Sequence, residues 1–545
     1  MDFDSVWFHD IGQVKVGDDY YPNGVPAPKP NEFNEDLEAL DVGLLKMGTG
    51  TLTLAGKNTF GGPTVIEGGE IALGLADQDD GKAGLTGAVY VGVSGTFSGN
   101  GIVDGTLFSE GLLVPGLEEA PGSTLRVTNN VTSHGALGIF FGNTGKANQL
   151  QVGGVADLDG TEILLSGMLG GAMPSHSYEI VSATSLIGSP ANTSAEAQQG
   201  VTMRHSFKME PSGNTLQAVY SSSEVLPQAK ALSEGFLAGA ELVALGSDLV
   251  AGQGMREAEK AARYSASAGT SVGVFYGISG GSTRYESGSH VDMSSFSFML
   301  GLSAGWDIAP GRLTTAAFFE YGSGAYDTYN YFANAGSVHG DGEIYHVGGG
   351  ILGRLDFNKS GSGRFYAEAS VRAGRIHNEY GNADLQDPWG RSARYESTST
   401  YFGFHTGAGY LWNISEKSTF DLYTKFFWTR QKGDTVTLST GDTVKFSDTD
   451  SSRLRIGGRF TYAANVHVSP FVGLAWEHEF DGRARATTNG FAIEAPSVRG
   501  SSGIGEIGLT LKPSQTLPIS FDIGVQGYVG RRKGVTASLQ VRFDF

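Results

Sequence analysis

The chain has 545 residues, of which 17% are charged, and it contains 82 glycines and no cysteine. The length suggests more than one domain, and the missing cysteine excludes disulfide staples. Without a collagen-like period, so many glycines indicate turns, bulges and close β packing. The net charge is −19, and residues 1–222 hold 25 acidic but only 9 basic residues, which excludes nucleic-acid binding through a basic face of that part.

Residues 1–222 consist of short apolar runs separated by Gly, Asn, Asp and Ser. Residues 50–56 (GTLTLAG) and 69–73 (GEIAL) are examples, and each is too short to bury a face of its own. Stacked as coils of a β-helix, such strands share one continuous core. The segment therefore predicts a right-handed parallel β-helix stalk. A β-sandwich is the alternative, although long regular strands are lacking.

Residues 223–265 are rich in Ala, Leu and Glu after Pro227. Proline suits a first helical turn, and the residues that follow are good helix formers, so the segment predicts the one long helix of the chain. One face of it carries Leu232, Phe236, Gly239 and Val243 at spacings of three and four. The acids form a second stripe at intervals of seven, namely Glu234, Glu241 and Asp248. A surface helix packed on a soluble domain is the alternative.

Residues 266–545 alternate apolar and polar residues with a period of two, the pattern of half-buried strands. In several strands one face carries charges and the other carries none, which is typical of an outer-membrane barrel with a wet lumen. The inward polar residues expected from this alternation are Glu320, Glu368, Arg372, Arg455, Arg459 and Glu477. Aromatic residues such as Trp412 and Trp476 fall near strand ends, where interfacial girdles form.

Twelve strands are expected in this zone, starting near residues 272, 295, 313, 344, 365, 401, 420, 453, 467, 503, 519 and 535. Long polar connections at 325–342, 381–399 and 433–451 contrast with short turns at 358–363, 413–417 and 531–534. That alternation is typical of external loops and periplasmic turns. The predicted fold class is therefore all-β, with domains at 1–222 (stalk), 223–265 (linker helix) and 266–545 (barrel).

The last eleven residues, 535–545, alternate without interruption and end on Phe545. A strand of this length suits a tilted membrane crossing, which needs about 9–11 residues. It must pair with the first strand so that the barrel has no edge. The residues expected to face the lumen are Thr536, Ser538, Gln540 and Arg542, and those expected to face lipid are Leu539, Val541, Phe543 and Phe545.

Twelve tilted strands leave a pore of about 10 Å, close to the 10–12 Å diameter of one α-helix. We therefore expect the linker helix to thread the lumen and to place its acids against Arg372, Arg455 or Arg459. Residues 1–222 would then emerge outside. No signal peptide occurs at the start, and no apolar run of about 18 residues predicts a transmembrane helix, so export needs sequence upstream of Met1.

The three zones in this order resemble an autotransporter of the type V secretion family over nearly the whole chain. Residues 48–73 resemble the passenger-associated transport repeat, and residues 526–545 resemble the final hairpin of the family. The repeat positions are Gly50, Leu52, Leu54, Gly56, Asn58 and Gly62.

The resemblance implies a monomeric barrel in the lipid of the bacterial outer membrane, with residues 1–222 leaving through it and folding at the cell surface. It also implies periplasmic chaperones and the barrel-assembly machinery as partners. In that family the machinery recognises the terminal aromatic and alternate apolar residues, which here are Phe545, Phe543, Val541 and Leu539.

Several short motifs suggest chemistry but lie in the wrong context. G-x-S-x-G occurs at 277–281 and 301–305, and G-x-G-x-x-G at 503–508, all in expected strands without the strand–turn–helix context those motifs need. The 11 histidines do not cluster at metal spacing. We therefore expect no enzyme activity, no cofactor and no metal.

The leading functional hypothesis is an outer-membrane device that translocates and anchors its own N-terminal passenger. One alternative is a surface adhesin whose β-helix binds a host surface ligand. Another is the stalk and barrel of a protease whose catalytic domain lies upstream of residue 1. A plain porin is disfavoured by the helix, because a porin lumen stays open.

Overall fold

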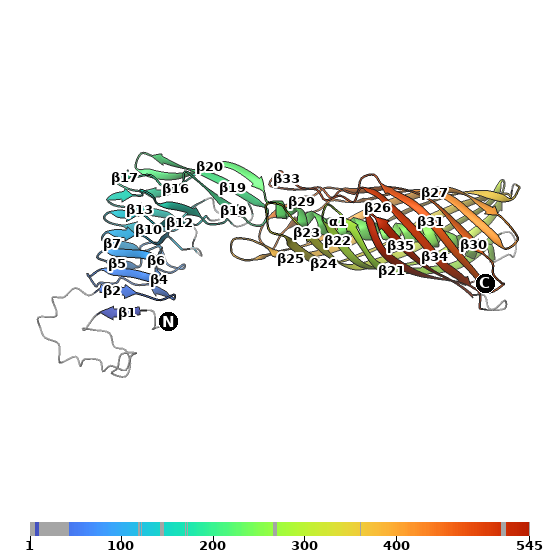
Figure 1. Ribbon diagram of the computed structural model, residues 1–545, viewed down its shortest axis with the longest axis horizontal. Helices are drawn as coiled ribbons and strands as arrows, with labels where there is room; N and C mark the ends of the chain where they lie inside the picture. Colours follow the sequence, from blue (N-terminus) through green and yellow to red (C-terminus); the bar gives the residue numbers. More distant parts are fainter. Residues whose placement is uncertain are drawn as a thin grey trace, which may run out of the picture. The chain divides into compact units, whose positions relative to one another are not determined.

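The computed structural model describes residues 6–9, 43–117, 120, 122–141, 146–168, 171, 173–264, 270–359, 361–513 and 519–543. The chain divides into two compact units, residues 1–224 with 387–390, and the remainder of 225–545. Strands dominate both units, and the long helix belongs to the second (Figure 1).

The first unit is built from short strands. They are β1 (Val6–His9), β2 (Gly43–Lys46), β3 (Thr51–Leu54), β4 (Thr64–Leu73), β5 (Gly84–Thr86), β6 (Val89–Gly99), β7 (Ile102–Asp104), β8 (Leu107–Ser109), β9 (Leu112–Pro115), β10 (Thr124–Val127), β11 (Val131–Ser133), β12 (Ala136–Ile139), β13 (Gln149–Val152), β14 (Val155–Asp157), β15 (Glu162–Leu165), β16 (Ser177–Ser182), β17 (Ser185–Ile187), β18 (Ser194–Gln199), β19 (Met203–Ser212) and β20 (Thr215–Val225).

Most of these strands pair in parallel with the strand one coil further along the chain. Leu125 of β10 lies opposite Leu150 of β13, for example. Because equivalent positions stack, the inward side chains of successive coils form one apolar core that includes Ile71 and Phe97. This pairing confirms the β-helix and excludes the sandwich. At the end of the unit, β18 pairs with β19 and β16 with β20 in antiparallel fashion.

The second unit contains the predicted closed, antiparallel barrel of twelve strands. They are β21 (Thr270–Glu286), β22 (His290–Ile308), β23 (Gly311–Asn330), β24 (Val338–Phe357), β25 (Gly363–Gln386), β26 (Ser392–Asn413), β27 (Ser418–Gln431), β30 (Thr449–Tyr462), β31 (Val468–Glu479), β34 (Gly500–Leu511), β35 (Ile519–Gly530) and β36 (Arg532–Phe543). The last strand pairs with both β35 and β21, so the sheet has no edge.

Two of the long loops expected from the sequence are largely strand. β23 to β26 run for 20 to 24 residues, well beyond the 9–11 that cross a membrane. The polar segments 325–342 and 381–399 thus mainly continue the ladder. Beyond the lipid-facing band both faces of a strand are polar, so its sequence resembles a loop although the backbone pairing persists.

The third long connection, 433–451, carries strands that the sequence did not indicate. Within it β28 (Thr435–Thr437) and β29 (Thr443–Phe446) form a hairpin. They join β32 (Ala486–Thr488) and β33 (Phe491–Ile493) in a four-stranded sheet. The expectation that 531–534 is a periplasmic turn is wrong. Arg532 at the start of β36 pairs with Tyr285 near the end of β21, so this turn lies at the barrel end of the β21–β22 connection, opposite to the short turns at 358–363 and 413–417.

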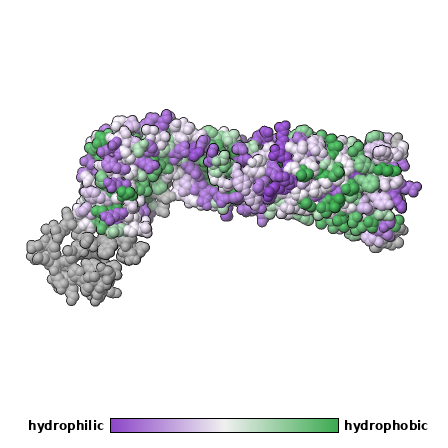
Figure 2. All heavy atoms as spheres, in the orientation of Figure 1, coloured by the Kyte–Doolittle hydropathy of each residue, from purple (hydrophilic) through white to green (hydrophobic). Residues whose placement is uncertain are grey.

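The outer surface of the barrel carries an apolar band. Outward side chains that are solvent-exposed in the isolated chain include Leu302, Ile351, Leu422, Leu474, Ile507 and Val529. Hydrophobic residues gather toward one end of the barrel, while hydrophilic residues cover the strands beyond them (Figure 2). An apolar exterior of this kind matches a hydrocarbon solvent rather than water.

Candidate functional site

The helix occupies the barrel lumen. It starts with a 3₁₀ turn (Pro227–Ala229), continues as α1 (Lys230–Leu249), widens into a π turn (Val250–Gly254) and ends as α2 (Met255–Tyr264). By length and composition it could cross a membrane, contrary to the sequence expectation, but 89% of its most apolar window is buried inside the protein. It is therefore a lumen helix, and the surface-helix alternative is wrong (Figure 1).

The N-terminal half of the helix, which we call its outer half, makes mainly aromatic and backbone contacts with the barrel. Phe236 stacks on Phe446 of β29, with ring centroids 4.5 Å apart. The hydroxyl of Tyr395 donates to the carbonyl of Leu232 at 2.8 Å. The amide of Asn378 donates to the carbonyl of Gly235 at 2.6 Å. These contacts hold the helix beneath the small outer sheet that contains β29.

Two glycines let the helix lie this close to the wall. A Cβ added at Gly235 would lie 2.6 Å from the ring of Tyr380 and 2.7 Å from the hydroxyl of Tyr395. One added at Gly239 would lie 2.9 Å from the side chain of Gln431. Since real Cβ contacts are longer, a larger residue at Gly235 would meet the ring of Tyr380, and one at Gly239 would require the side chain of Gln431 to move.

Of the three predicted helix acids, only Asp248 forms ion pairs with arginines of the wall. Glu234 instead accepts hydrogen bonds from Ser287 Oγ (2.7 Å) and Asn330 Nδ2 (2.9 Å). Glu241 is buried within electrostatic reach of Arg453. The expectation that all three acids meet arginines is therefore wrong for Glu234, which lies beside polar uncharged residues at the outer end.

Asp248 is held by three arginines from two strands of the wall. Arg453 Nη1 and Arg455 Nη2 donate to Oδ1 at 2.9 and 2.8 Å, and Arg532 Nη1 donates to Oδ2 at 2.8 Å. Glu477 accepts from both Arg453 and Arg455, at 3.4 and 2.6 Å. We call Arg453, Arg455 and Arg532 the arginine clamp.

The other predicted lumen residues also point inward, and all six are buried. Arg372 donates to the wall residue Glu320 at 2.8 Å and to the helix carbonyl of Val243. Its contact with the helix is therefore to the backbone and not to a helix acid. Glu368 accepts from Lys425, which also donates to the carbonyl of Ala251 in the π turn.

Arg459 pairs with the wall residue Glu506 rather than with an acid of the helix. A second wall carboxylate, Asp522, lies 3.9 Å from its guanidinium group. The sequence identified its inward direction but not its partner.

The inner half of the helix is linked to the wall by charges. Glu257 pairs with Arg542 at 2.8 Å and Lys260 with Asp522 at 2.5 Å. Sequence reasoning missed these residues of α2, and it missed Arg453 and Arg532. The period-two pattern places both wall arginines on the inward face. Which of the inward arginines meet a helix acid depends on where the helix lies, and the pattern does not show that.

The closing strand follows the expected alternation with one difference. Thr536, Ser538, Gln540 and Arg542 are buried on the lumen side, and Leu539 is half-buried. Val541, expected to face lipid, is only 3% exposed, because its cross-strand neighbours Tyr276 and Phe521 stand beside it. Phe545 and the side chain of Phe543 lie outside the described residues.

The repeat positions in the first unit have backbone roles. Leu52 is buried and Leu54 packs against the core. Asn58 Nδ2 donates to the carbonyls of Gly56 and Gly84, at 3.0 Å each, and so joins neighbouring coils. The carbonyl of Gly50 accepts from the amide of Glu70, and Gly62 is buried beneath the next coil. These residues therefore stabilise the coil.

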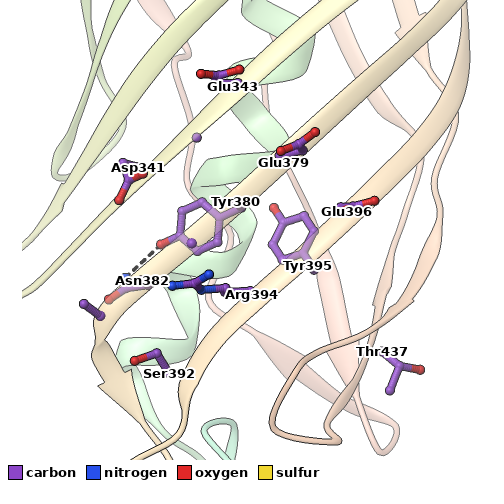
Figure 3. Close-up of a pocket in the computed structure, with 13 residues that line it drawn as sticks. Asp341, Glu343, Glu379, Tyr380, Asn382, Ser392, Arg394, Tyr395, Glu396 and Thr437 are labelled. Carbon is purple, nitrogen blue, oxygen red and sulfur yellow. Dashed lines mark hydrogen bonds between the residues drawn. The ribbon is translucent and has the colours of Figure 1, made fainter.

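An open cavity of about 720 Å³ lies at the outer end of β24 to β26. Acidic side chains from three strands surround it, and Tyr380 accepts a 2.9 Å hydrogen bond from Asn382 at its floor (Figure 3). Among the described residues no group of three or more His, Asp or Glu side chains could hold a metal ion. The lumen, with its helix and its charges, is therefore the candidate site.

Two segments match known families. Residues 299–524 match the autotransporter beta-domain, and residues 44–73 match the passenger-associated-transport-repeat. Comparison with curated proteins gave no match.

Similar solved structures include three autotransporter domains. The transport unit of AIDA-I from Escherichia coli is 16% identical, with a TM-score of 0.38, and the match covers 50% of this chain and 90% of that one. The beta domain of the Bordetella autotransporter BrkA is 17% identical, with a TM-score of 0.38 and coverage of 50% and 99%. The translocator domain of NalP from Neisseria meningitidis is 11% identical, with a TM-score of 0.41 and coverage of 58% and 99%.

Proposed function

We propose that this chain, an autotransporter, secretes residues 1–222 through its own barrel and then keeps them anchored at the cell surface. Its β-domain makes it an outer-membrane translocator with a surface-exposed passenger. The observation that supports self-secretion is the lumen helix, because it follows β20 directly and leads into β21. The barrel, the plug and the passenger are thus one covalent chain.

Protease treatment of intact cells tests this proposal. We expect external protease to digest residues 1–222 and to leave a protected fragment that migrates faster in SDS when unheated than when boiled. Control cells lysed before treatment show whether protease reaches the periplasm. A passenger that becomes digestible only after lysis, or a fragment that heat does not shift, would contradict self-secretion.

An adhesin function for the passenger is the second candidate. The excess of 25 acidic over 9 basic residues in 1–222 favours binding to a basic surface such as a cationic host matrix component. Binding of the displayed passenger to host matrix should then weaken steeply with salt. Salt-independent binding, or none, would remove this candidate. The protease alternative concerns sequence upstream of residue 1 and stays a hypothesis.

We also propose that the chain performs no catalysis and takes no cofactor. The G-x-S-x-G segments lie in β21 and β22, and Ser303 Oγ of the second donates to the carbonyl of Gly273. Such a serine is part of a ladder rather than of a strand–turn–helix elbow.

As partners we propose periplasmic chaperones during transit and the barrel-assembly machinery at insertion, with Leu539, Val541, Phe543 and Phe545 as the recognised residues. Deleting Phe545 should reduce the amount of heat-modifiable barrel in cells while the purified variant still folds into lipid. A variant that also fails to fold in pure lipid would indicate a structural role instead.

A further inference from the structure

The arginine clamp has more hydrogen-bond donors than its present partners use. Of the described residues, Asp248 and Glu477 are the carboxylates within hydrogen-bond distance of its guanidinium groups. Arg453 Nε and both Nε and Nη2 of Arg532 are buried without a hydrogen-bond partner among the described residues. Unpaired buried donors on a cation carry a large desolvation cost, which an additional anion would offset.

Two members of the clamp, Arg455 and Arg532, are positioned by the wall, whereas Arg453 also donates to the helix carbonyl of Ala244 at 3.1 Å. Glu477 holds Arg455 through two nitrogens, at 2.9 and 2.6 Å. The guanidinium of Arg532 lies over the ring of Tyr528, 3.8 Å from its centroid, and such stacking restrains a planar cation. Arg455 and Arg532 therefore keep wall contacts that do not depend on Asp248.

Other lumen cations have carboxylates of the wall beside them. Arg372 has Glu320, Arg459 has Glu506, and Lys425 has Glu368. The clamp differs because, among the described residues, its three arginines face only two carboxylates of the wall. Glu477 bonds to Arg453 and Arg455, and Glu479 lies within electrostatic reach of Arg453. Without the helix this part of the lumen therefore has an excess of positive charge.

The chain that must pass this level is acidic. Residues 1–222 carry 25 acidic and 9 basic residues, which is about one carboxylate every nine residues. Guanidinium groups bind carboxylates through charge-assisted, often bidentate hydrogen bonds. An extended acidic segment in the lumen would therefore meet donors that are already oriented for its side chains.

We propose that the arginine clamp is a binding site for the Asp and Glu side chains of this chain's own passenger during transit, and that Asp248 occupies the same site once transit ends. The inference rests on the proposed self-secretion. Each passing carboxylate exchanges for the next, so the site favours entry of acidic segments. Asp248, on the segment that stays behind, is the final occupant.

Pulse-labelled cells expressing the full chain test the proposal by the half-time at which residues 1–222 become digestible by external protease. We expect Arg532→Gln and Arg453→Gln to lengthen this half-time about tenfold or more, in keeping with the loss of one charged hydrogen bond. Arg430→Gln, which removes a part-exposed arginine paired with Asp450, is the matched control. Heat-modifiable migration checks that each barrel is assembled.

A second arm separates transit from anchoring. Neutralising Asp77, Asp79 and Asp80 of the passenger should reduce the difference in exposure half-time between Arg532→Gln and the parent. Asp248→Asn keeps all three guanidinium groups, so it should raise the conductance of the finished pore without the delay caused by Arg532→Gln.

Equal half-times for Arg532→Gln and the parent would overturn the proposal, as would a delay that is unchanged by the neutral passenger. An equal delay in Asp248→Asn would assign the clamp to anchoring alone. If the parent itself never exposes residues 1–222, it is self-secretion that fails, and the two failures are thereby distinguished.

Discussion

The two units of this chain place their apolar residues on opposite sides of the sheet. In the first unit the inward side chains, such as Ile71, Phe97 and Leu125, form a dry core. In the second unit the inward side chains include Glu320, Arg372 and many other charges, while a band of exposed apolar side chains faces outward. Both arrangements use the same period-two alternation of a strand.

The difference shows that the solvent, not the strand, decides which face is apolar. The first unit buries apolar area from water, at roughly 25 cal/mol per Å². The barrel leaves its apolar face to hydrocarbon and must satisfy a polar interior instead. It does so by pairing wall charges with each other and with the helix, and these ion pairs add to the aromatic and apolar contacts that also hold the helix.

Removing the helix should produce the largest effect. Deleting residues 227–264 from the full chain should convert a closed barrel into one with a stable open conductance in planar bilayers, because a passage about the width of a helix, 10–12 Å, is vacated. Deleting residues 1–222 while keeping the helix is the matched control and should leave the barrel closed. An equal conductance in both variants would show that the helix does not seal the lumen.

A charge in the core of the first unit should come next. Leu125→Lys places an ammonium group in a position that is 0% exposed and apolar, which should cost about 5 kcal/mol and unfold the neighbouring coils. Protease sensitivity of residues 43–222 checks this, and the barrel should keep its heat-modifiable migration. Leu125→Ala, with a cost of about 2–5 kcal/mol, separates lost packing from buried charge. Protease resistance equal to that of the parent would contradict a dry core.

The same substitution on the barrel exterior sharpens the comparison. Leu474 is 73% exposed in the isolated chain and lies in the middle of β31. Leu474→Lys should nevertheless destabilise the barrel by about 2–4 kcal/mol in lipid, since the exposed face contacts hydrocarbon. Urea titration of folding into vesicles measures it, with Leu474→Ala as control. No cost in lipid would mean that this face meets water.

The alternation within single strands was enough to predict the barrel. Each strand has one apolar face, which suits lipid, and one polar face, which suits a watery lumen. The inward residues Glu368 and Arg455 could be identified in this way, and so could the closing strand. The β-helix followed from short apolar runs whose only means of burial is stacking.

Partners could not be predicted, because they depend on register and helix rotation. Arg532 faces Asp248 only when β36, the helix and β30 are all in place, although 284 residues separate the two along the chain. The extent of the strands was also hidden. Residues 381–386 belong to strand β25, although their sequence is mostly polar. The sequence contains no feature that distinguishes such a segment from a loop.

The smallest expected effect concerns a polar group in the first unit. His205 is fully buried, and burial lowers its pKa from 6.5 to about 4. Its ring contacts Ser223 Oγ and Gln199 Oε1, at 2.7 and 2.8 Å. The folded unit therefore keeps this histidine neutral, whereas the unfolded chain binds a proton below pH 6.5.

The contribution of His205 to the free energy of unfolding is thus fully present above pH 6.5. It declines as the pH falls toward 4, by at most about 3 kcal/mol. We expect the protection factors of amides in β18 to β20, which are corrected for the intrinsic pH dependence of exchange, to fall over this range in the parent. In His205→Gln the group is absent, so the protection factors should change less with pH although the unit starts less stable. Parallel pH profiles of exchange protection for the two proteins would show that the core of this unit tolerates an imidazolium. The contrast between a dry core and a charged lumen would then be weaker than the burial of His205 indicates.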